Sequence, residues 1–259
     1  MEAATRALAG ATSHLRTIAL EEVLATAELQ TRVDRKYVVP LGLLTTALDR
    51  TAGELRVLRI GTARLFRYES VYFDTPGLTA YRQHAHGRRR RVKVRTRTYL
   101  DSGECLLEFK SVGPRGETLK ERYPYHLAAR GELDAEARAL AQVRVGHAIA
   151  TSALRSVLTT SYRRATLVDP VRGSRVTCDV DLRFQDPAGR RFGPLDDVVV
   201  VESKTTGSEC SMDGVLRRLG ARPVSLSKYC VGMAVLDPRL PANRWNRELR
   251  THFGWTPQR

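Results

Sequence analysis

The sequence has little lysine, no closely spaced cysteine pair and no long apolar run. Only six of its 43 basic residues are Lys, and the other 37 are Arg. Lys is normally among the commonest residues of soluble proteins, so this scarcity indicates a general bias towards Arg. Positions that keep a Lys favour a compact point charge over the planar fork of a guanidinium. These positions are Lys36, Lys93, Lys110, Lys120, Lys204 and Lys228.

The other absences each exclude a class of protein. The four cysteines include no Cys-x-x-Cys pair, so we expect buried thiols rather than a zinc site or a redox motif. No apolar run is long enough to cross a bilayer. The sequence also lacks the basic start followed by an apolar stretch that is typical of a secretory signal. The common phosphate-binding loops, Walker A and Gly-x-Gly-x-x-Gly, are absent. We therefore expect a cytoplasmic protein.

What remains is a strongly basic chain of globular composition. Its 259 residues carry a formal net charge of +15, and 42% of them are hydrophobic. That hydrophobic content is ordinary for a folded protein, and the length suits one large domain or two small ones. The charge predicts an anionic partner: nucleotide, polyphosphate, nucleic acid or membrane phosphate.

Alternation of polar and apolar residues predicts strands joined by short turns. Strands are expected over 31–39, 65–73, 89–100, 104–110, 117–125, 160–168, 174–184 and 195–204. Helices are expected within 13–29 and over 40–52, 78–86, 132–158, 209–219 and 227–236. Because the strands do not alternate regularly with helices, the pattern favours an α+β domain with an antiparallel sheet. The expected organisation is a helical segment 1–30, a main domain 31–236 and a tail 237–259.

Five of the six lysines lie on strand faces that are rich in charge. On the strand 89–100, Lys93, Arg95 and Arg97 are two positions apart and so share one face. A solvated face can alternate in this way, but like charges side by side repel unless an anion or neighbouring acids balance them. A closed antiparallel barrel with these faces turned inward would bind a chain of phosphates. Acids on the same faces would balance the charge or bind Mn²⁺ or Mg²⁺: Asp34, Glu108, Asp179, Asp181 and Glu202.

Seven short motifs in a fixed order resemble one protein family. They are Arg32-Val33-Asp34-Arg35-Lys36-Tyr37, Ser70-Val71-Tyr72-Phe73-Asp74-Thr75, Arg95-Thr96-Arg97-Thr98-Tyr99, Leu107-Glu108-Phe109-Lys110, Lys120-Glu121-Arg122-Tyr123, Val201-Glu202-Ser203-Lys204 and Ser227-Lys228-Tyr229. In order and spacing they resemble the VTC domain, the polyphosphate polymerase branch of the triphosphate tunnel metalloenzymes. The resemblance runs through most of the chain.

The resemblance implies a closed antiparallel barrel of about eight strands with flanking helices. ATP or another nucleoside triphosphate would bind inside with Mn²⁺ or Mg²⁺, and its γ-phosphate would pass to a polyphosphate chain. Glu202 resembles the metal-binding glutamate, and Glu108 is our second candidate metal ligand. The residues expected to act on the triphosphate are Lys36, Arg95, Arg97, Lys110, Lys120, Arg164 and Lys228. Further substrate contacts are expected from Lys93, Arg122, Tyr162, Lys204 and Ser227.

Two departures from the family pattern leave an alternative open. The wider superfamily opens with Glu-x-Glu-x-Lys, where this chain has Arg32, Asp34 and Lys36, so metal binding rests more on Glu202. The eukaryotic polymerases also carry a basic residue two positions before the Ser-Lys pair, and here that position is Ser225. A triphosphatase, in which water attacks at the same site, is therefore the alternative to a polymerase.

A third hypothesis is a non-enzymatic binder of polyanions or nucleic acid. The charge of +15 suits it, and such binding would weaken with salt. It does not explain why Glu108 and Glu202 share faces with the bases, and no helix-turn-helix, zinc or RNP signature is present. We therefore expect ATP and polyphosphate as partners and no specific nucleic acid. Coupling to the inner face of a membrane would need a partner protein.

Two remaining features receive structural interpretations. His84 and His86, close to the run Arg88–Arg91, are interpreted as an exposed basic loop rather than a metal pair. The tail contains Trp245 and Trp255, and packing against the domain explains it at least as well as contact with a partner.

Overall fold

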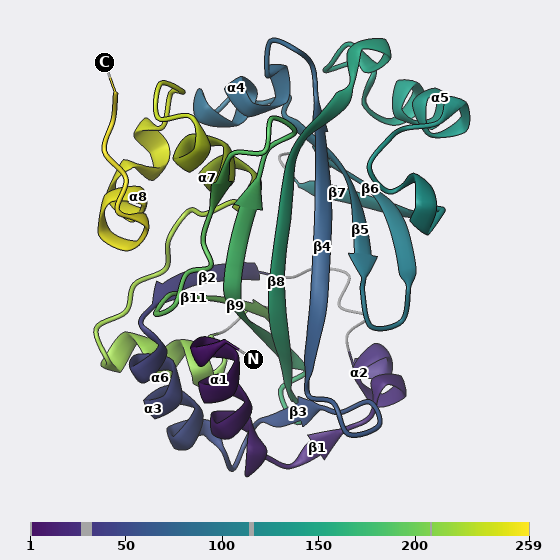
Figure 1. Ribbon diagram of the computed structural model, residues 1–259. Helices are drawn as coiled ribbons and strands as arrows, with labels where there is room; N and C mark the ends of the chain where they lie inside the picture. Colours follow the sequence, from purple (N-terminus) through teal and green to yellow (C-terminus); the bar gives the residue numbers. More distant parts are fainter. Residues whose placement is uncertain (1, 27–32, 114–116, 208, 259) are drawn as a thin grey trace. The chain divides into compact units, whose positions relative to one another are not determined.

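The structure is a computed structural model that describes residues 2–26, 33–113, 117–207 and 209–258 (Figure 1). The first two residues of the predicted strand 31–39, which include Arg32, and the turn residues 114–116 lie outside these ranges. The chain divides into two compact units. The first unit contains Met1–Phe66, Tyr162–Leu182 and Gly193–Ser225, and the second contains Arg67–Ser161, Arg183–Phe192 and Leu226–Arg259.

The first unit is a sheet with helices packed on one face. Strands β2 (Val33–Val39) and β9 (Ser174–Gln185) each pair antiparallel with β11 (Val199–Thr205). Pro40 precedes the first turn of a helix, where a fixed φ is favourable. The apolar strand faces pack against α1 (Ala3–Ser13), α3 (Leu41–Thr51) and α6 (Ser211–Arg218), which lie together in Figure 1. The unit also contains β1 (Thr17–Ile18), α2 (Leu20–Thr26) and β3 (Arg56–Leu58).

The second unit is built on an antiparallel meander. Its strands pair in chain order: β4 (Leu65–Asp74), β5 (Val92–Tyr99), β6 (Glu104–Val112) and β7 (Thr118–Pro124). Buried and half-buried side chains alternate along β5, as expected for a strand with one covered face. Helix α5 (Ala135–Val145) covers the apolar face. The other elements are α4 (Thr79–Ala85), β10 (Arg191–Phe192), α7 (Lys228–Leu236) and α8 (Asn246–Phe253).

All these strands belong to one largely antiparallel sheet, and that sheet is open. The hydrogen-bonded path is β2-β11-β9-β8-β4-β5-β6-β7, with β8 at Arg155–Asp169. Over the part of the chain that the structure describes, no pairing joins β7 to β2. The α+β class with flanking helices is confirmed, but the prediction of a closed barrel is wrong. The alternation of polar and apolar residues indicates which face of a strand a side chain occupies. Because this alternation is the same in open and closed sheets, it could not show whether the sheet closes.

Other segments also differ from the prediction. The helix expected over 132–158 ends at Val145, and strand β8 begins at Arg155. The Ala-rich start of this segment favours a helix. The β-branched residues that follow Arg155 favour a strand. The first helix begins at Ala3 rather than near residue 13. The two-residue strand β1 and three-residue strand β3 are too short for periodicity to detect.

The tail and the cysteines agree with their structural interpretations. Trp255 Nε1 donates a hydrogen bond to the backbone oxygen of Ala234 in α7 at 3.0 Å, and Trp245 is buried. All four cysteines are buried and none forms a disulfide. Among the described segments, no helix combines the length and apolar content that spanning a membrane requires.

Candidate functional site

A row of three lysines crosses the charged face of the second unit. In register, Lys93 of β5 lies opposite Lys110 of β6, and Lys110 lies opposite Lys120 of β7. Residues that are directly opposite share a face, with Cβ atoms about 4.5–5.5 Å apart, and like charges there are destabilising. Lys110 is exposed, whereas Lys93 and Lys120 are half-buried. An anion along this row would lower the repulsion.

The next row is built around a buried carboxylate. Glu108 is only 2% exposed and lies between Arg95 and Arg122 in register. Its carboxylate oxygens have four cationic neighbours: Arg95 Nη2 at 2.5 Å, Lys120 Nζ at 2.8 Å, Arg122 Nε at 3.1 Å and Arg97 Nε at 3.9 Å. The cluster holds more positive than negative charge, so it suits a multiply charged anion.

Burial and charge shift the titration of this cluster. Burial by itself would raise the pKa of Glu108, but Arg95, Arg97 and Lys120 outweigh it and hold that pKa well below its usual range. Burial lowers the pKa of Lys120, and the neighbouring arginines lower it further, while Glu108 offsets only part of the shift. A negatively charged ligand would favour the protonated form of Lys120.

The first unit carries a second charged face. Lys36 of β2 lies opposite Glu202 of β11. Lys204 Nζ is 3.1 Å from Glu202 Oε1 and 3.8 Å from Asp34 Oδ2. Lys36 is half-buried, and no ion pair of its side chain is found within the described ranges. This face therefore presents two carboxylates around one lysine, and a second lysine beside them.

Arg164 and Tyr162 form a rigid group on the same unit. Arg164 donates to both oxygens of Asp179, from Nε at 2.6 Å and from Nη2 at 2.8 Å. Its guanidinium carbon lies 5.2 Å from the centre of the Tyr162 ring. Because Asp179 is 1% exposed and the pair is bidentate, the guanidinium plane is fixed. Tyr162, a predicted substrate contact, and Arg164, predicted to act on the triphosphate, thus lie together.

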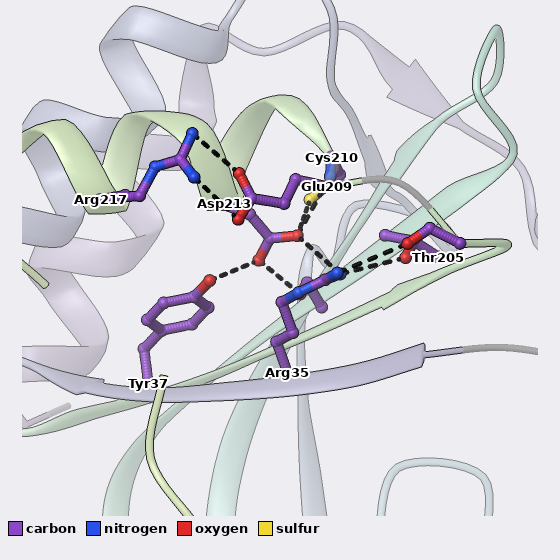
Figure 2. A network of polar contacts seen from close by, with 9 residues as sticks. Arg35, Tyr37, Thr205, Glu209, Cys210, Asp213 and Arg217 are labelled. Atoms are coloured by element: carbon purple, nitrogen blue, oxygen red, sulfur yellow. Dashed lines mark hydrogen bonds and ion pairs between the residues drawn. The ribbon is translucent and has the colours of Figure 1, made fainter. Parts of the chain in front are cut away.

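On the opposite face of β2 and β11, a buried carboxylate joins the strands to α6 (Figure 2). Asp213 is 0% exposed and accepts hydrogen bonds from Tyr37 Oη at 2.9 Å, Ser203 Oγ at 2.6 Å and the backbone N–H of Cys210 at 3.0 Å. Arg35 Nη1 lies 3.6 Å from it. Alternate side chains of a strand point to opposite faces, so this network lies on the other side of β2 and β11 from the candidate charges. It fixes the two strands that carry those charges.

The carboxylates of the two units differ in their fitness for a metal. Mg²⁺ is usually held by one or two carboxylates together with phosphate oxygens and water. Glu202 and Asp34 supply two carboxylates, and both lie within ion-pair distance of Lys204, so a bound metal would compete with that one lysine. Glu108 has cations around both of its oxygens. No group of three or more His, Cys, Asp or Glu side chains suited to a metal occurs among the residues that the structure places.

His84 differs from its interpretation as part of an exposed loop. It lies in α4, is half-buried, and its Nε2 is 3.1 Å from the backbone oxygen of Val92. Burial lowers the pKa of His84 to about 2, and the positive charge of Lys93 adds to that shift. His86 and Arg88 are exposed, as expected.

We expect His84 to make the protein less stable in mild acid. Between its folded pKa of about 2 and its unfolded value of 6.5, the unfolded state binds one more proton, so the free energy of unfolding falls as pH falls. His84→Gln should reduce that slope by up to about 1.4 kcal/mol per pH unit. Urea unfolding between pH 4 and 7 measures the slope, with the exposed His86→Gln as control. Equal slopes in both variants would contradict the assignment.

The predicted site residues fall into two groups, one in each unit. Ser227 is the N-cap of α7 and accepts from the backbone N–H of Cys230 at 3.4 Å, and Lys228 is the first residue of that helix. The group in the first unit is Lys36, Tyr162, Arg164, Glu202 and Lys204. The group in the second unit is Lys93, Arg95, Arg97, Glu108, Lys110, Lys120, Arg122, Ser227 and Lys228.

Comparisons with known proteins bear on this arrangement. The family model of the VTC domain matches residues 31–237. No curated protein gives a significant match. A candidate adenylate cyclase from Bacillus halodurans has a TM-score of 0.51 at 16% identity, over 76% of this chain and 93% of that chain. A candidate adenylyl cyclase from Hippeastrum, reported to have a dominant triphosphatase activity, has a TM-score of 0.53 at 15% identity, over 79% of this chain and 96% of that chain. At such identities these two structures show a shared fold alone.

Proposed function

Because the chain belongs to the VTC domain family, we propose that it is a metal-dependent phosphotransferase that moves the γ-phosphate of a nucleoside triphosphate to a polyphosphate chain. The observation that carries the proposal is the row Lys93, Lys110 and Lys120, set beside the cluster around Glu108. Like charges directly opposite one another on a sheet are unfavourable unless an anion or a neighbouring acid balances them, as Glu108 does for Lys120. A polyphosphate or triphosphate supplies closely spaced negative charges that match such a row.

The proposed chemistry is transfer by positioning and charge neutralisation. A terminal phosphate oxygen of the acceptor attacks the γ-phosphorus, and the bond from that phosphorus to the bridging oxygen of the leaving diphosphate breaks. Little covalent chemistry is then left for the protein, which must align the groups and neutralise the charge on the phosphoryl oxygens. The lysine row binds phosphate oxygens, and Arg95 is held in place for the same purpose by Glu108.

The metal is assigned to the first unit. Glu202 and Asp34 would hold Mn²⁺ or Mg²⁺, which when bound would supply positive charge to phosphate oxygens at the charged face of the first unit. We propose that Glu108 holds its cationic neighbours in place and does not bind the metal. Four cations already surround its carboxylate, so it attracts a further cation only weakly. ATP and polyphosphate are the proposed ligands, and a membrane partner and a cytoplasmic location stay predictions from the sequence.

A triphosphatase is the second candidate function. Two observations favour it: Ser225 stands where the eukaryotic polymerases have a basic residue, and the Hippeastrum protein of similar fold has triphosphatase activity. The two reactions differ only in the nucleophile, because water replaces the acceptor phosphate.

We expect the purified protein to convert ATP to polyphosphate in the presence of Mn²⁺ or Mg²⁺. A polyphosphate gel and an assay of free phosphate, run on the same samples, distinguish the candidates. A ladder supports the polymerase, and free phosphate without a ladder supports the triphosphatase. Glu202→Gln, which keeps the size of the side chain and removes its charge, should lower either activity at least about tenfold. If neither product forms with either metal, the enzyme proposal fails.

A further inference from the structure

A buried carboxylate lies at the end of β4 in the second unit and is not part of any predicted site. Asp74 is 0% exposed. Its Oδ1 accepts from the backbone N–H groups of Thr75 at 2.7 Å and Ala80 at 2.9 Å. Its Oδ2 accepts from the backbone N–H of Tyr81 at 2.9 Å and from the hydroxyl of Tyr229 at 2.5 Å. Asp74 therefore joins the end of a strand, the start of α4 and a tyrosine of α7.

Tyr229 connects this carboxylate with an arginine of the candidate site. It is 1% exposed, and its ring stacks on that of Tyr72, with ring centres 5.1 Å apart and planes 23° apart. The hydroxyl of Tyr72 accepts a hydrogen bond from Arg95 Nη1 at 2.9 Å. A continuous chain of contacts thus leads from Asp74 through Tyr229 and Tyr72 to Arg95.

The same tyrosine fixes the beginning of α7. Tyr229 is the second residue of that helix and directly follows Ser227 and Lys228, which the family resemblance implies in substrate binding. Its hydrogen bond to Asp74 holds the first helical turn in place. Displacing Tyr229 would move two side chains that are predicted to bind phosphate. Lys228 would move because it is the preceding residue in the backbone, and Arg95 would move because it donates to Tyr72, on which Tyr229 stacks.

Filling the space beside Tyr72 does not need the hydroxyl group, whereas holding the first turn of α7 against Asp74 does. A phenylalanine would fill the same volume and stack on Tyr72 without burying a polar group, which is costly unless it is paired. Asp74 already accepts three backbone N–H bonds, so its charge is partly satisfied without Tyr229. Burial raises the pKa of Tyr229 well above its ordinary value, and the charge of Asp74 raises it further, so the hydroxyl stays a donor.

We propose that Tyr229, held by Asp74, is a positioning residue that sets Lys228 and Arg95 for phosphate binding. The inference rests on the proposed function, since it assigns those two cations to a triphosphate. Tyr229 itself contacts no phosphate in this proposal. It acts only by fixing the helix start and the ring that carries the acceptor for Arg95.

The test compares Tyr229→Phe with a matched variant, Tyr81→Phe. Tyr81 is also buried, and its ring meets that of Tyr229 edge-on at 6.2 Å, but its hydroxyl donates to the backbone oxygen of Pro241 at 3.1 Å. Isothermal titration with inorganic tripolyphosphate measures the Kd, and thermal unfolding measures stability. Tyr229→Phe should weaken binding about tenfold, because small misplacements of ligating groups have large effects. Tyr81→Phe should change the Kd less than about twofold.

A double-mutant cycle separates positioning from general destabilisation. If Tyr229 acts partly through Lys228, adding Tyr229→Phe to Lys228→Ala should weaken binding several-fold less than it does in the wild type. A loss that is equal in both backgrounds would contradict the inference. Tyr72→Phe, which removes only the acceptor for Arg95, is expected to weaken binding as well and gives a second measurement should Tyr229→Phe fold poorly.

The outcomes distinguish this inference from the proposed function. If the wild-type protein does not bind tripolyphosphate, the proposed function fails and the inference fails with it. If the wild type binds but Tyr229→Phe binds equally well, the inference alone fails. It fails also if Tyr81→Phe and Tyr229→Phe weaken binding to the same extent.

Discussion

Glu108→Gln should unfold well below the temperature of the wild-type protein, and added tripolyphosphate should restore more stability to the variant than to the wild type. The substitution keeps the shape of the side chain but removes the buried negative charge between Arg95, Arg97, Lys120 and Arg122. Breaking a buried ion pair by removing one partner typically costs about 3–5 kcal/mol. A polyanion would supply the lost negative charge, so the ligand should raise the unfolding temperature of the variant more.

Calorimetry with and without tripolyphosphate measures both effects. Glu104→Gln is the control, because Glu104 begins the same strand and is exposed, so its loss should change stability by no more than about 0.5 kcal/mol. Ligand stabilisation depends on the concentration relative to Kd, so all proteins are compared at one ligand concentration. Equal ligand-induced shifts in the wild type and Glu108→Gln would show that the cations around Glu108 do not bind the polyanion.

Lys36→Ala should abolish most triphosphate binding and leave stability nearly unchanged. Lys36 is half-buried, and no ion pair of its side chain occurs in the described residues, so its removal leaves no buried acid without a partner. A hydrogen bond to a charged group contributes about 1.5–3 kcal/mol, which corresponds to a loss of affinity of about 10- to 100-fold. Titration with tripolyphosphate measures the Kd, and urea unfolding measures stability.

The control for Lys36→Ala is the loss of a positive charge elsewhere on the same unit. Arg50 is exposed on α3, and Arg50→Ala should change the Kd less than about twofold at moderate salt, where distant surface charges are screened. If Lys36→Ala loses thermal stability and binding together, Lys36 is a structural residue, and the first unit's charged face needs another interpretation.

The sequence predicted which side chains share a face, but not which lie opposite one another. The alternation of Lys93, Arg95 and Arg97 with buried residues is confirmed along β5. The lysine row depends on strand register, which is set by turn geometry and by packing on the covered face. For the same reason an open sheet could not be told from a closed barrel. The family was predicted correctly because ordered motifs carry information that periodicity lacks.

The buried acids could not be assigned from the sequence for a different reason. Asp213 is one polar residue in a short helix, and its partners Tyr37 and Ser203 come from distant strands. Asp74 and Tyr229 lie inside two of the ordered motifs, yet nothing local shows that their side chains meet. Contacts between residues far apart in the chain arise from tertiary packing, and a pattern within one segment does not contain them.

The three strands that carry the lysine row follow one another directly in the chain. Pairing between consecutive strands closes small loops, and such local contacts form faster than distant ones. We therefore expect the repulsion among Lys93, Lys110 and Lys120 to arise early in folding, while these strands assemble. Glu108 lies on the middle strand and is a buried acid of that meander. We therefore expect the carboxylate of Glu108, which pairs with cations in the folded site, to lower this repulsion also while the meander forms.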